Sequence, residues 1–379
     1  MPTNTKLSEL IKAGIPGLTP ELLDHLPLPW HTIAESGVGY DIGESLLRAT
    51  QVALLLRQPM LITGDPGVGK TKFAAALAHR LQLQEDRFHR INVKTTTSGR
   101  DLLYSFDDVA RFRDATVGRL TGRGGAAEVG IRPLASYVVL NGLGRAIVRS
   151  AGPALAVKPA GVSMLEVAGP AHADKAQITL GELFPQEFKG SVGPEHTLVL
   201  IDEMDKAPRD APNDLLVEIE EMRFMIRELG MEIRASASHW PIVIFTSNSE
   251  RSFPDPFLRR CIFHHIEFPD DKRLAQIVAE RVSSLRQSAM EDDGKPKKPL
   301  IKTDSPLLKD AIEKFREARK IELDKPPGTA ELIALVAALL ELGKSLTQPM
   351  GLTPKEAAQF AGIIAKTRRD EEKVRNLLL

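Results

Sequence analysis

A glycine-rich segment that ends in a lysine and a threonine is the stretch of this chain best suited to chemistry. Residues 58–71 read Gln-Pro-Met-Leu-Ile-Thr-Gly-Asp-Pro-Gly-Val-Gly-Lys-Thr, with the spacing Gly64-x-x-x-x-Gly69-Lys70-Thr71. A short apolar run at 60–62 precedes the glycines, and helix-forming residues follow at 73–81. Strand, glycine loop and helix in that order are the context in which this motif, the P-loop, binds phosphate.

The chemistry of phosphate binding explains these residue types. Glycines let consecutive backbone N–H groups point into one small volume, and the start of a helix adds the positive end of its dipole. We expect Lys70 to reach the β- and γ-phosphates of ATP, and the Thr71 hydroxyl to ligate Mg²⁺. The alternative is a chance glycine turn before a helix. The residues predicted to bind the nucleotide are Gly64, Asp65, Pro66, Gly67, Val68, Gly69, Lys70 and Thr71.

Two adjacent acids end a second apolar run. Residues 197–203 read Thr-Leu-Val-Leu-Ile-Asp-Glu, which predicts a buried strand with Asp202 and Glu203 at its carboxyl end. In open parallel sheets, ligands bind beyond the carboxyl ends of the strands. Asp202 is therefore predicted to hold hydrated Mg²⁺, and Glu203 to orient or deprotonate the attacking water. The alternative is an ordinary strand followed by a charged turn.

A third apolar run, 241–248, ends in Thr-Ser-Asn. Asn248 is placed to hold the attacking water or the γ-phosphate, and the alternative is a plain turn amide. His264 and His265 are neighbours in a predicted strand, so their side chains face opposite sides and cannot chelate one metal together. The lone Cys261 is expected to be a buried thiol, and nothing in the sequence resembles a zinc site.

Composition sets broad limits on the function. The chain has 379 residues, enough for two or three domains, and equal numbers of basic and acidic residues, 50 of each. Zero net charge gives no general attraction to nucleic acid or to anionic membranes. A single cysteine excludes an intrachain disulfide, and we see neither a signal peptide nor an apolar run long enough to span a bilayer. We therefore expect a soluble cytoplasmic protein.

The elements expected around these motifs alternate between strands and helices. We expect helices over 42–56, 101–112 (capped by Asp101), 211–223, 271–290, 305–320, 329–342 and 354–364, strands over 87–93 and 261–268, and a hairpin over 224–234. Residues 114–131 are rich in glycine and indicate an insertion or a loop. The final leucines, 377–379, are expected to be exposed and to dock on the lid or on a neighbouring subunit.

At this point the sequence resembles the AAA+ ATPases. The likeness rests on the P-loop, the strand ending in Asp202 and Glu203, Asn248 at a strand end, and the pair Arg259 and Arg260 before the last strand. Three stretches, residues 95–104, 202–209 and 257–261, are similar to MoxR-type members.

The resemblance implies a P-loop AAA+ core with a five-stranded parallel sheet and an all-α lid, assembled as a ring that is usually a hexamer. Glu203 would be the catalytic glutamate, Asn248 the sensor-one residue, and Arg259 or Arg260 the arginine finger that one subunit inserts into the next. A guanidinium there would neutralise charge that spreads over the γ-phosphoryl oxygens. The alternative is a solvated arginine pair at a helix end, which the helix dipole also favours.

The same resemblance divides the chain into three parts. Residues 1–42 form an N-terminal helical extension, 43–269 the ATPase core, and 270–379 the helical lid. The core carries insertions at about 100–196 and at the hairpin, which would contact a substrate. Many relatives have an arginine at the start of a lid helix, whereas Ala330 stands at that point here, so sensor-two chemistry is not expected to follow the family pattern.

Three functions remain open from the sequence. The first is a Mg²⁺-dependent ring ATPase that remodels a partner protein, which the MoxR resemblance suggests carries a von Willebrand A domain. The second is a nucleic-acid-directed motor or nucleotide-gated scaffold of a nuclease complex, which the neutral charge disfavours. The third, a metabolic P-loop kinase, needs an acceptor pocket that the sequence does not reveal.

Overall fold

The computed structural model describes residues 42–120, 132–248, 253–287 and 301–379. These residues form two compact units. The first, an α/β unit, contains residues 42–64 and 70–266, and the second, a helical unit, contains 267–379 and groups with the short loop Asp65–Gly69. The predicted helical extension over residues 1–42 lies almost wholly outside the described residues.

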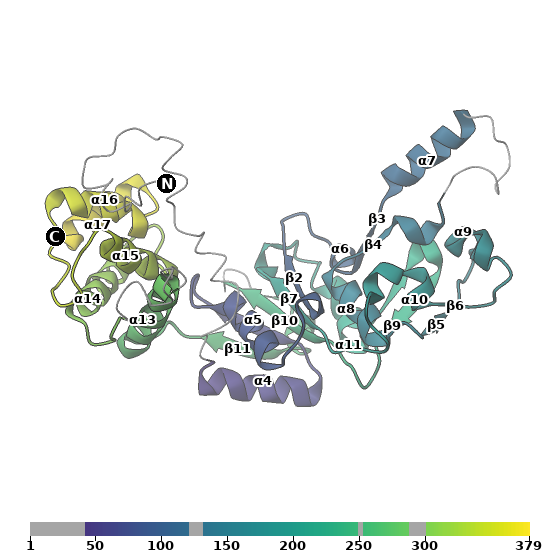
Figure 1. Cartoon of the computed structure of the whole chain (residues 1–379), viewed down its shortest axis with the longest axis horizontal. Coiled ribbons are helices and arrows are strands. Elements are labelled where there is room, and N and C mark those ends of the chain that lie inside the picture. The colour runs from purple at the N-terminus through teal and green to yellow at the C-terminus, as the bar shows by residue number, and fades with distance from the viewer. Residues whose placement is uncertain (1–41, 121–131, 249–252, 288–300) are drawn as a thin grey trace, which may run out of the picture. The chain divides into compact units, whose positions relative to one another are not determined.

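The α/β unit is built on the predicted five-stranded parallel sheet (Figure 1). Its strands are β1 (Met60–Gly64), β2 (Phe88–Asn92), β7 (Leu198–Asp202), β10 (Ile242–Ser247) and β11 (Ile262–Ile266). Their order across the sheet is β11-β1-β10-β7-β2, and each neighbouring pair is parallel. Because all the strands run the same way, the carboxyl ends of β1, β7 and β10 lie at one edge, where the polar motif residues follow.

Helices cover both faces of this sheet. Helices α4 (Glu44–Leu56) and α5 (Lys70–Arg80) pack against one face, with Met60 and Ile62 of β1. Helix α8 (Gly142–Ala151) packs against the other face, where Leu61 of β1 lies. Successive strand residues point to opposite faces, so burial of both faces explains why β1 and β7 are continuous apolar runs.

The predicted single helix over 101–112 is wrong. The chain forms a short helix, α6 (Gly99–Leu103), then strand β3 (Tyr104–Phe106), then a second helix, α7 (Asp108–Leu120). Strand β3 pairs antiparallel with β4 (Val138–Leu140). The extended backbone at Tyr104 lets the buried side chain reach the hairpin, where its hydroxyl donates to Glu228 at 3.0 Å and its ring lies against Phe224. This tertiary contact overrides the helical pattern.

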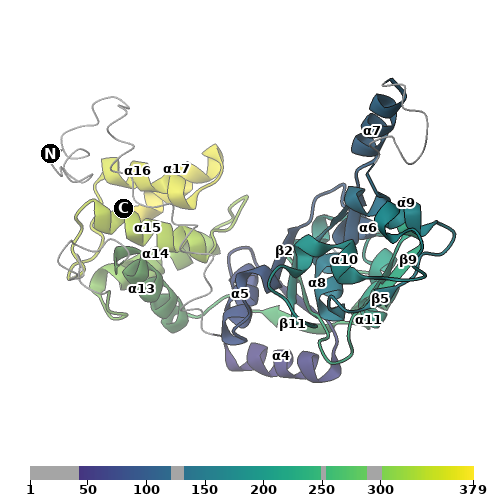
Figure 2. The same cartoon turned by 45° about the vertical axis from the view of Figure 1, so that its right-hand side comes forward.

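Two details of this region also differ from expectation. Ser98, rather than Asp101, is the N-cap of α6, and Asp101 is the acidic partner of the capping box three residues later. Residues 114–120 belong to α7 rather than to a loop, and 121–131 lie outside the described residues. Figures 1 and 2 both show α7 extending away from the rest of the α/β unit.

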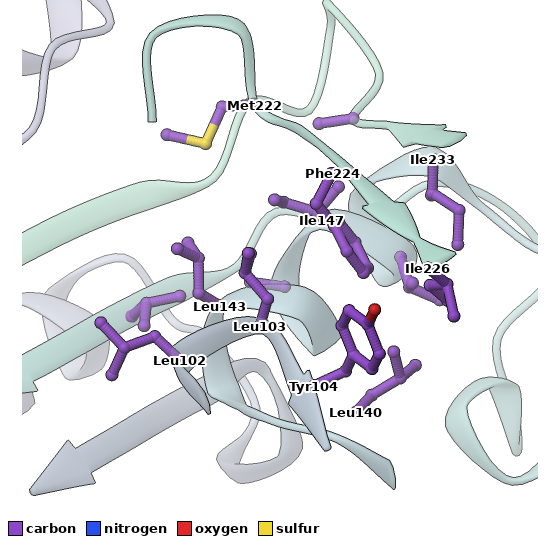
Figure 3. Packing of buried hydrophobic residues seen from close by; sticks show 14 of the residues in the cluster. Leu102, Leu103, Tyr104, Leu140, Leu143, Ile147, Met222, Phe224, Ile226 and Ile233 are labelled. Carbon is purple, nitrogen blue, oxygen red and sulfur yellow. The ribbon is translucent and has the colours of Figure 1, made fainter. Parts of the chain in front are cut away.

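The predicted hairpin is confirmed as β8 (Arg223–Ile226) and β9 (Met231–Arg234). The helix before it is shorter than expected: a 3₁₀ turn over Asn213–Leu215 leads into α11 (Leu216–Glu221). Met222, with φ +44°, ends α11 in the left-handed conformation, and its buried side chain turns into the core. Figure 3 shows the hairpin packing on α6, β3 and α8 through Leu103, Tyr104, Ile147 and Phe224.

Short elements complete the α/β unit. They are β5 (Ala156–Val157), α9 (Met164–Ala168), β6 (Ile178–Thr179), α10 (Leu180–Leu183) and α12 (Asp255–Leu258), with 3₁₀ turns over Glu85–Arg87, Leu134–Tyr137, Pro170–His172, Pro185–Phe188, Met204–Lys206 and Arg227–Leu229.

The helical unit has its own apolar core. Its helices are α13 (Asp271–Gln287), α14 (Pro306–Lys320), α15 (Thr329–Glu341), α16 (Pro354–Ile364) and α17 (Arg368–Leu378). The expectation that the last leucines are all exposed is wrong, because Leu378 is 2% exposed and joins this core at one turn from Val374. Within the described ranges, no helix has both the length and the apolar character needed to cross a bilayer.

A buried histidine predicts how the stability of the α/β unit depends on pH. Burial, together with the nearby Arg145 and Arg149, lowers the pKa of His89 to about 4, although Asp86 opposes the shift. The unfolded chain takes up a proton near pH 6.5 that the folded chain does not. Stability is therefore present above pH 6.5 and is lost as the pH falls towards 4, by about 2 kcal/mol at pH 5.

Urea unfolding at pH 7 and pH 5 measures this loss. A His89→Leu variant should lose less stability than the parent between the two pH values, whereas His79→Gln, at an exposed position of α5, should keep the full dependence. An identical pH dependence in the parent and in His89→Leu would contradict the assignment.

Candidate active site at the carboxyl edge of the sheet

The glycine loop between β1 and α5 has the backbone that its residue types predict. Gly67 and Gly69 have φ of +83° and +98°, in the region that side chains other than glycine rarely adopt. Lys70 and Thr71 are the first two residues of α5, so their N–H groups lie at the positive end of its dipole. The loop therefore has the main-chain curl and the helix start that a phosphate needs.

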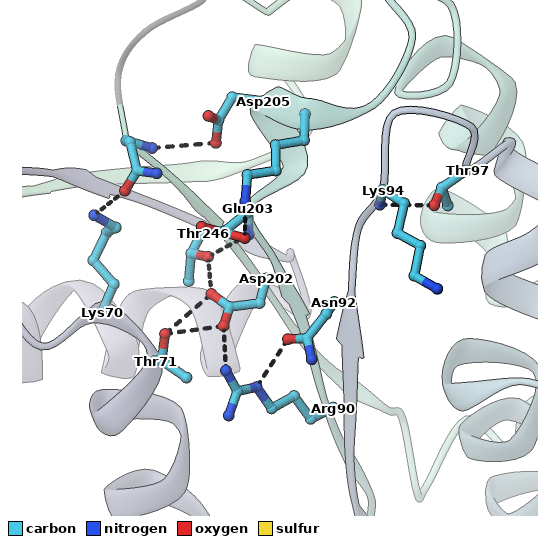
Figure 4. A network of polar contacts seen from close by, with 12 residues as sticks. Lys70, Thr71, Arg90, Asn92, Lys94, Thr97, Asp202, Glu203, Asp205 and Thr246 are labelled. Carbon is cyan, nitrogen blue, oxygen red and sulfur yellow. Dashed lines mark hydrogen bonds and ion pairs between the residues drawn. The ribbon is translucent and has the colours of Figure 1, made fainter. Parts of the chain in front are cut away.

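Lys70 joins the first and third predicted motifs. Its Nζ is buried and donates to the Gly64 carbonyl at 2.7 Å and to Asn248 Oδ1 at 2.8 Å (Figure 4). Asn248 follows β10, which lies next to β1 in the sheet. In turn, the Asn248 N–H donates to Asp205 Oδ1 at 3.2 Å, so a buried acid holds the asparagine backbone.

Thr71 and Asp202 are also brought together. The Thr71 hydroxyl lies 3.1 and 3.0 Å from the two carboxylate oxygens of Asp202. The Thr246 hydroxyl donates to Asp202 Oδ1 at 2.5 Å, and Arg90 Nη2 donates to Oδ2 at 2.9 Å. A hydroxyl and a carboxylate side by side are hard oxygen ligands of the kind that Mg²⁺ prefers, so the residues present fit the predicted metal.

Glu203 stands on unusual backbone. It has φ +60° and ψ +48°, a left-handed conformation that costs a residue other than glycine about 1 kcal/mol or more. Its N–H donates to the Thr246 hydroxyl at 2.9 Å. Its carboxylate pairs with Lys206 Nζ at 2.5 Å, and this hydrogen bond raises the pKa of Lys206.

The two predicted arginines differ in their surroundings. Arg260 Nε donates to Glu220 of α11 at 2.8 Å, and its Nη1 donates to the Pro256 carbonyl at 3.0 Å. Arg259 is exposed at the end of α12. The structure thus holds Arg260 within its own subunit and presents Arg259 to solvent.

Four residues of this site did not emerge from the sequence: Arg90, Thr246, Asp205 and Lys206. Arg90 and Thr246 lie within predicted strands, close to their carboxyl ends, whereas Asp205 and Lys206 follow one. The paired register sets Asn92 of β2 opposite Asp202, two residues beyond Arg90. Aligning the carboxyl ends of the predicted strands would have pointed to Arg90 and Thr246. The contacts of Asp205 and Lys206 depend on the 3₁₀ turn after Glu203, and no sequence pattern predicts this turn.

The described part of the chain contains no cluster of three or more His, Cys, Asp or Glu side chains that could bind a metal ion. Cys261 is a free, buried thiol whose pKa burial raises to about 12. His265 Nδ1 is 3.0 Å from the Thr63 hydroxyl, and burial with the adjacent His265 lowers the pKa of His264. The surroundings of Cys261, His264 and His265 therefore suit a structural role.

Comparison with known proteins agrees with this geometry. Residues 59–147 match the model of the AAA domain, dynein-related subfamily. This part of the chain is similar to an AAA domain. This match begins at β1 and covers the glycine loop, α5 and β2, so it includes Lys70 and Thr71 but not Asp202 or Asn248.

None of the curated proteins matches the sequence significantly. Among solved structures, the chain is similar to a proline-to-glycine mutant of RuvB from Thermotoga maritima, at 13% identity and a TM-score of 0.39, covering 95% of this chain and 74% of that one. So distant a likeness says nothing about substrate or partner. The AAA domain as a class binds and hydrolyses nucleotide, and its members usually assemble into rings.

Proposed function

We propose that this protein is a Mg²⁺-dependent AAA+ ATPase of the MoxR type, which works as a ring and remodels a partner protein. The observation that carries the proposal is the convergence of Lys70, Thr71, Asp202 and Asn248 at one edge of the sheet, with hydrogen bonds of 2.8 to 3.1 Å joining them in pairs. In the proposed division, residues 43–269 form the ATPase core and 270–379 the lid.

The side chains divide the work of hydrolysis. Backbone N–H groups of residues 64–71 and Lys70 Nζ would bind the phosphates, with Lys70 exchanging its contact to Asn248 for one to the nucleotide. Thr71 and Asp202 would hold Mg²⁺, which neutralises charge on the phosphate oxygens when bound. Glu203 would accept a proton from the attacking water once Lys206 releases its carboxylate. Asn248 would orient that water or the γ-phosphate.

Arg259 is proposed as the arginine finger. A finger must reach a neighbouring subunit. Its side chain therefore has to be exposed at the surface and must not be held by contacts within its own subunit. Arg259 is exposed, whereas Arg260 holds Glu220 and the Pro256 carbonyl. Arg260 is therefore proposed to brace α12 against α11, so that α12 presents Arg259 at a fixed angle.

The two insertions, at about 100–196 and at the hairpin, are proposed to form the surface that contacts the partner. Arg100 of α6 and Tyr104 of β3 both bond to Glu228 in the hairpin, at 2.5 and 3.0 Å, which ties the two insertions into one body. From that body α7 extends with Val109 and Phe112 69% and 74% exposed. Large contiguous apolar patches mark binding surfaces, and we propose that these two side chains, three residues apart on α7, belong to such a surface. The MoxR resemblance suggests a partner with a von Willebrand A domain.

Replacing Lys70 tests the nucleotide site. Lys70→Ala should weaken ATP binding by tenfold or more in calorimetry, because a buried charge-assisted hydrogen bond to phosphate contributes about 1.5–3 kcal/mol. Lys189→Ala removes the same charge at an exposed, distant position and should bind ATP like the parent. Equal ATP affinity in Lys70→Ala and the parent would contradict the assignment of Lys70 to the nucleotide site.

A different result would favour the second candidate function. If DNA stimulates the ATPase activity, and this stimulation falls steeply with salt concentration, the protein would instead be a nucleic-acid-directed motor.

A further inference from the structure

Arg90 is a basic residue of the site to which the proposed hydrolysis gives no task. It lies on β2, and its side chain reaches across to Asp202 at the end of the neighbouring strand β7 (Figure 4). Its Nη2 donates to Asp202 Oδ2 at 2.9 Å and its Nε donates to Asn92 Oδ1 at 3.1 Å. The cation thus contacts the very carboxylate that is proposed to hold the metal.

The surroundings of Asp202 explain why a cation is needed there. Its side chain is 6% exposed, so water screens the carboxylate poorly. A buried carboxylate without a compensating charge costs several kcal/mol. Two hydroxyls, of Thr71 and Thr246, supply hydrogen bonds to it but no charge. Arg90 supplies positive charge through a direct ion pair with Asp202, and Lys206, which pairs with Glu203, adds a weaker attraction from further away.

If Asp202 holds Mg²⁺, the metal would compete with Arg90 for the same carboxylate. A divalent ion arriving next to the guanidinium meets like charge as well as the ion pair that it must replace. A triphosphate that accompanies the metal brings negative charge, which offsets both effects. The Arg90 side chain is 39% exposed and remains bonded to Asn92, so the guanidinium has room to leave Asp202 without disturbing β2.

We propose that Arg90 is the counter-ion of Asp202 in the nucleotide-free site and that it disfavours binding of Mg²⁺ alone. The metal then enters together with the triphosphate. The inference rests on the proposed function, because it takes Asp202 as a metal-holding residue. It gives Arg90 a positioning and metal-selecting part rather than a catalytic one.

Binding of Mn²⁺, as a paramagnetic probe for the metal site, tests this on the full chain without nucleotide. Electron paramagnetic resonance measures free Mn²⁺ directly. Arg90→Met should bind Mn²⁺ about tenfold more tightly than the parent, the change expected for removal of one charge-assisted contact. Arg48→Met, at an exposed position of α4 where Arg48 pairs with Glu44, removes the same charge elsewhere and should leave the affinity unchanged.

A second variant separates charge from hydrogen bonding. Arg90→Gln keeps a donor but no charge, so it should bind Mn²⁺ as tightly as Arg90→Met does. It also serves as the charge-free variant if Arg90→Met fails to fold, which circular dichroism would reveal. If nucleotide-free Mn²⁺ affinity in the charge-free variants equals or falls below that of the parent, the counter-ion inference is overturned.

A parallel titration with ATP present distinguishes the two proposals. Tight Mn²⁺ binding by the parent with ATP, together with unchanged nucleotide-free affinity in Arg90→Met, would overturn the inference and leave the ATPase proposal standing. If the parent binds no Mn²⁺ even with ATP, beyond the binding of Mn²⁺ to ATP itself, the metal site fails and both proposals fall together.

Discussion

A Glu203→Gln protein is expected to bind ATP normally and to release phosphate about 10²–10⁴-fold more slowly than the parent, the range in which a positioned general base contributes. The amide has nearly the shape of the carboxylate but cannot accept the proton of the attacking water. Phosphate release under excess ATP measures the rate, and calorimetry measures the binding.

The control for this variant is Glu85→Gln, which makes the same chemical change at an exposed 3₁₀ turn away from the carboxyl edge. It should hydrolyse ATP at the parent rate. Should Glu203→Gln also do so, the assignment of Glu203 as the base is wrong.

The Glu203→Gln variant should hold ATP for long periods, so it also suits a study of assembly. Native mass spectrometry with and without ATP and Mg²⁺ can report ring size, and a lysate pull-down under the same conditions can identify the partner.

The second large effect is expected at Arg259. Arg259→Ala should lower ATP turnover by about 10³–10⁵-fold, which is the contribution measured for arginine fingers in phosphoryl transfer. Arg260→Ala is the matched control, one residue away and of the same size. It should lose its contacts to Glu220 and Pro256 and so lower stability more than turnover. The reverse order of the two turnover losses would assign the finger to Arg260.

Mixing subunits tests whether Arg259 acts on a neighbour. Arg259→Ala has an intact Glu203, and Glu203→Gln has an intact Arg259, so each lacks what the other supplies. A mixed ring contains interfaces at which both groups are present, and its ATPase activity should exceed that of either variant alone. A mixture no more active than its two components would show that the finger does not act between subunits.

The strands were predictable because of where they lie. β1, β7 and β10 are buried on both faces, so each appears in the sequence as a short apolar run, and the polar residue after each run marks the same edge of a parallel sheet. Asp202 and Asn248 were found in this way, and the glycine-rich motif after β1 identified Lys70 and Thr71. The structure joins Lys70 to Asn248 and Thr71 to Asp202.

The insertion was less predictable because its structure depends on distant partners. Residues 101–112 have helical spacing, yet Tyr104 is extended because its hydroxyl reaches Glu228, far along the chain. Arg90 and Lys206 likewise have no local signature, since each is defined by the acid that it pairs with across strands or around a turn. Local pattern cannot report contacts of this kind.

The two acids of the site, Asp202 and Glu203, both bond to the hydroxyl of Thr246. It donates to the Asp202 carboxylate and accepts from the Glu203 backbone, so one oxygen atom touches both neighbours. The pair cannot be tuned separately: a methyl group in its place, as in Thr246→Val, would disturb the metal-holding group and the water-activating group at once. Substitutions at positions 202, 203 and 246 should therefore be strongly non-additive, and a sequence change that adapts one acid to a new task would need a compensating change at the other.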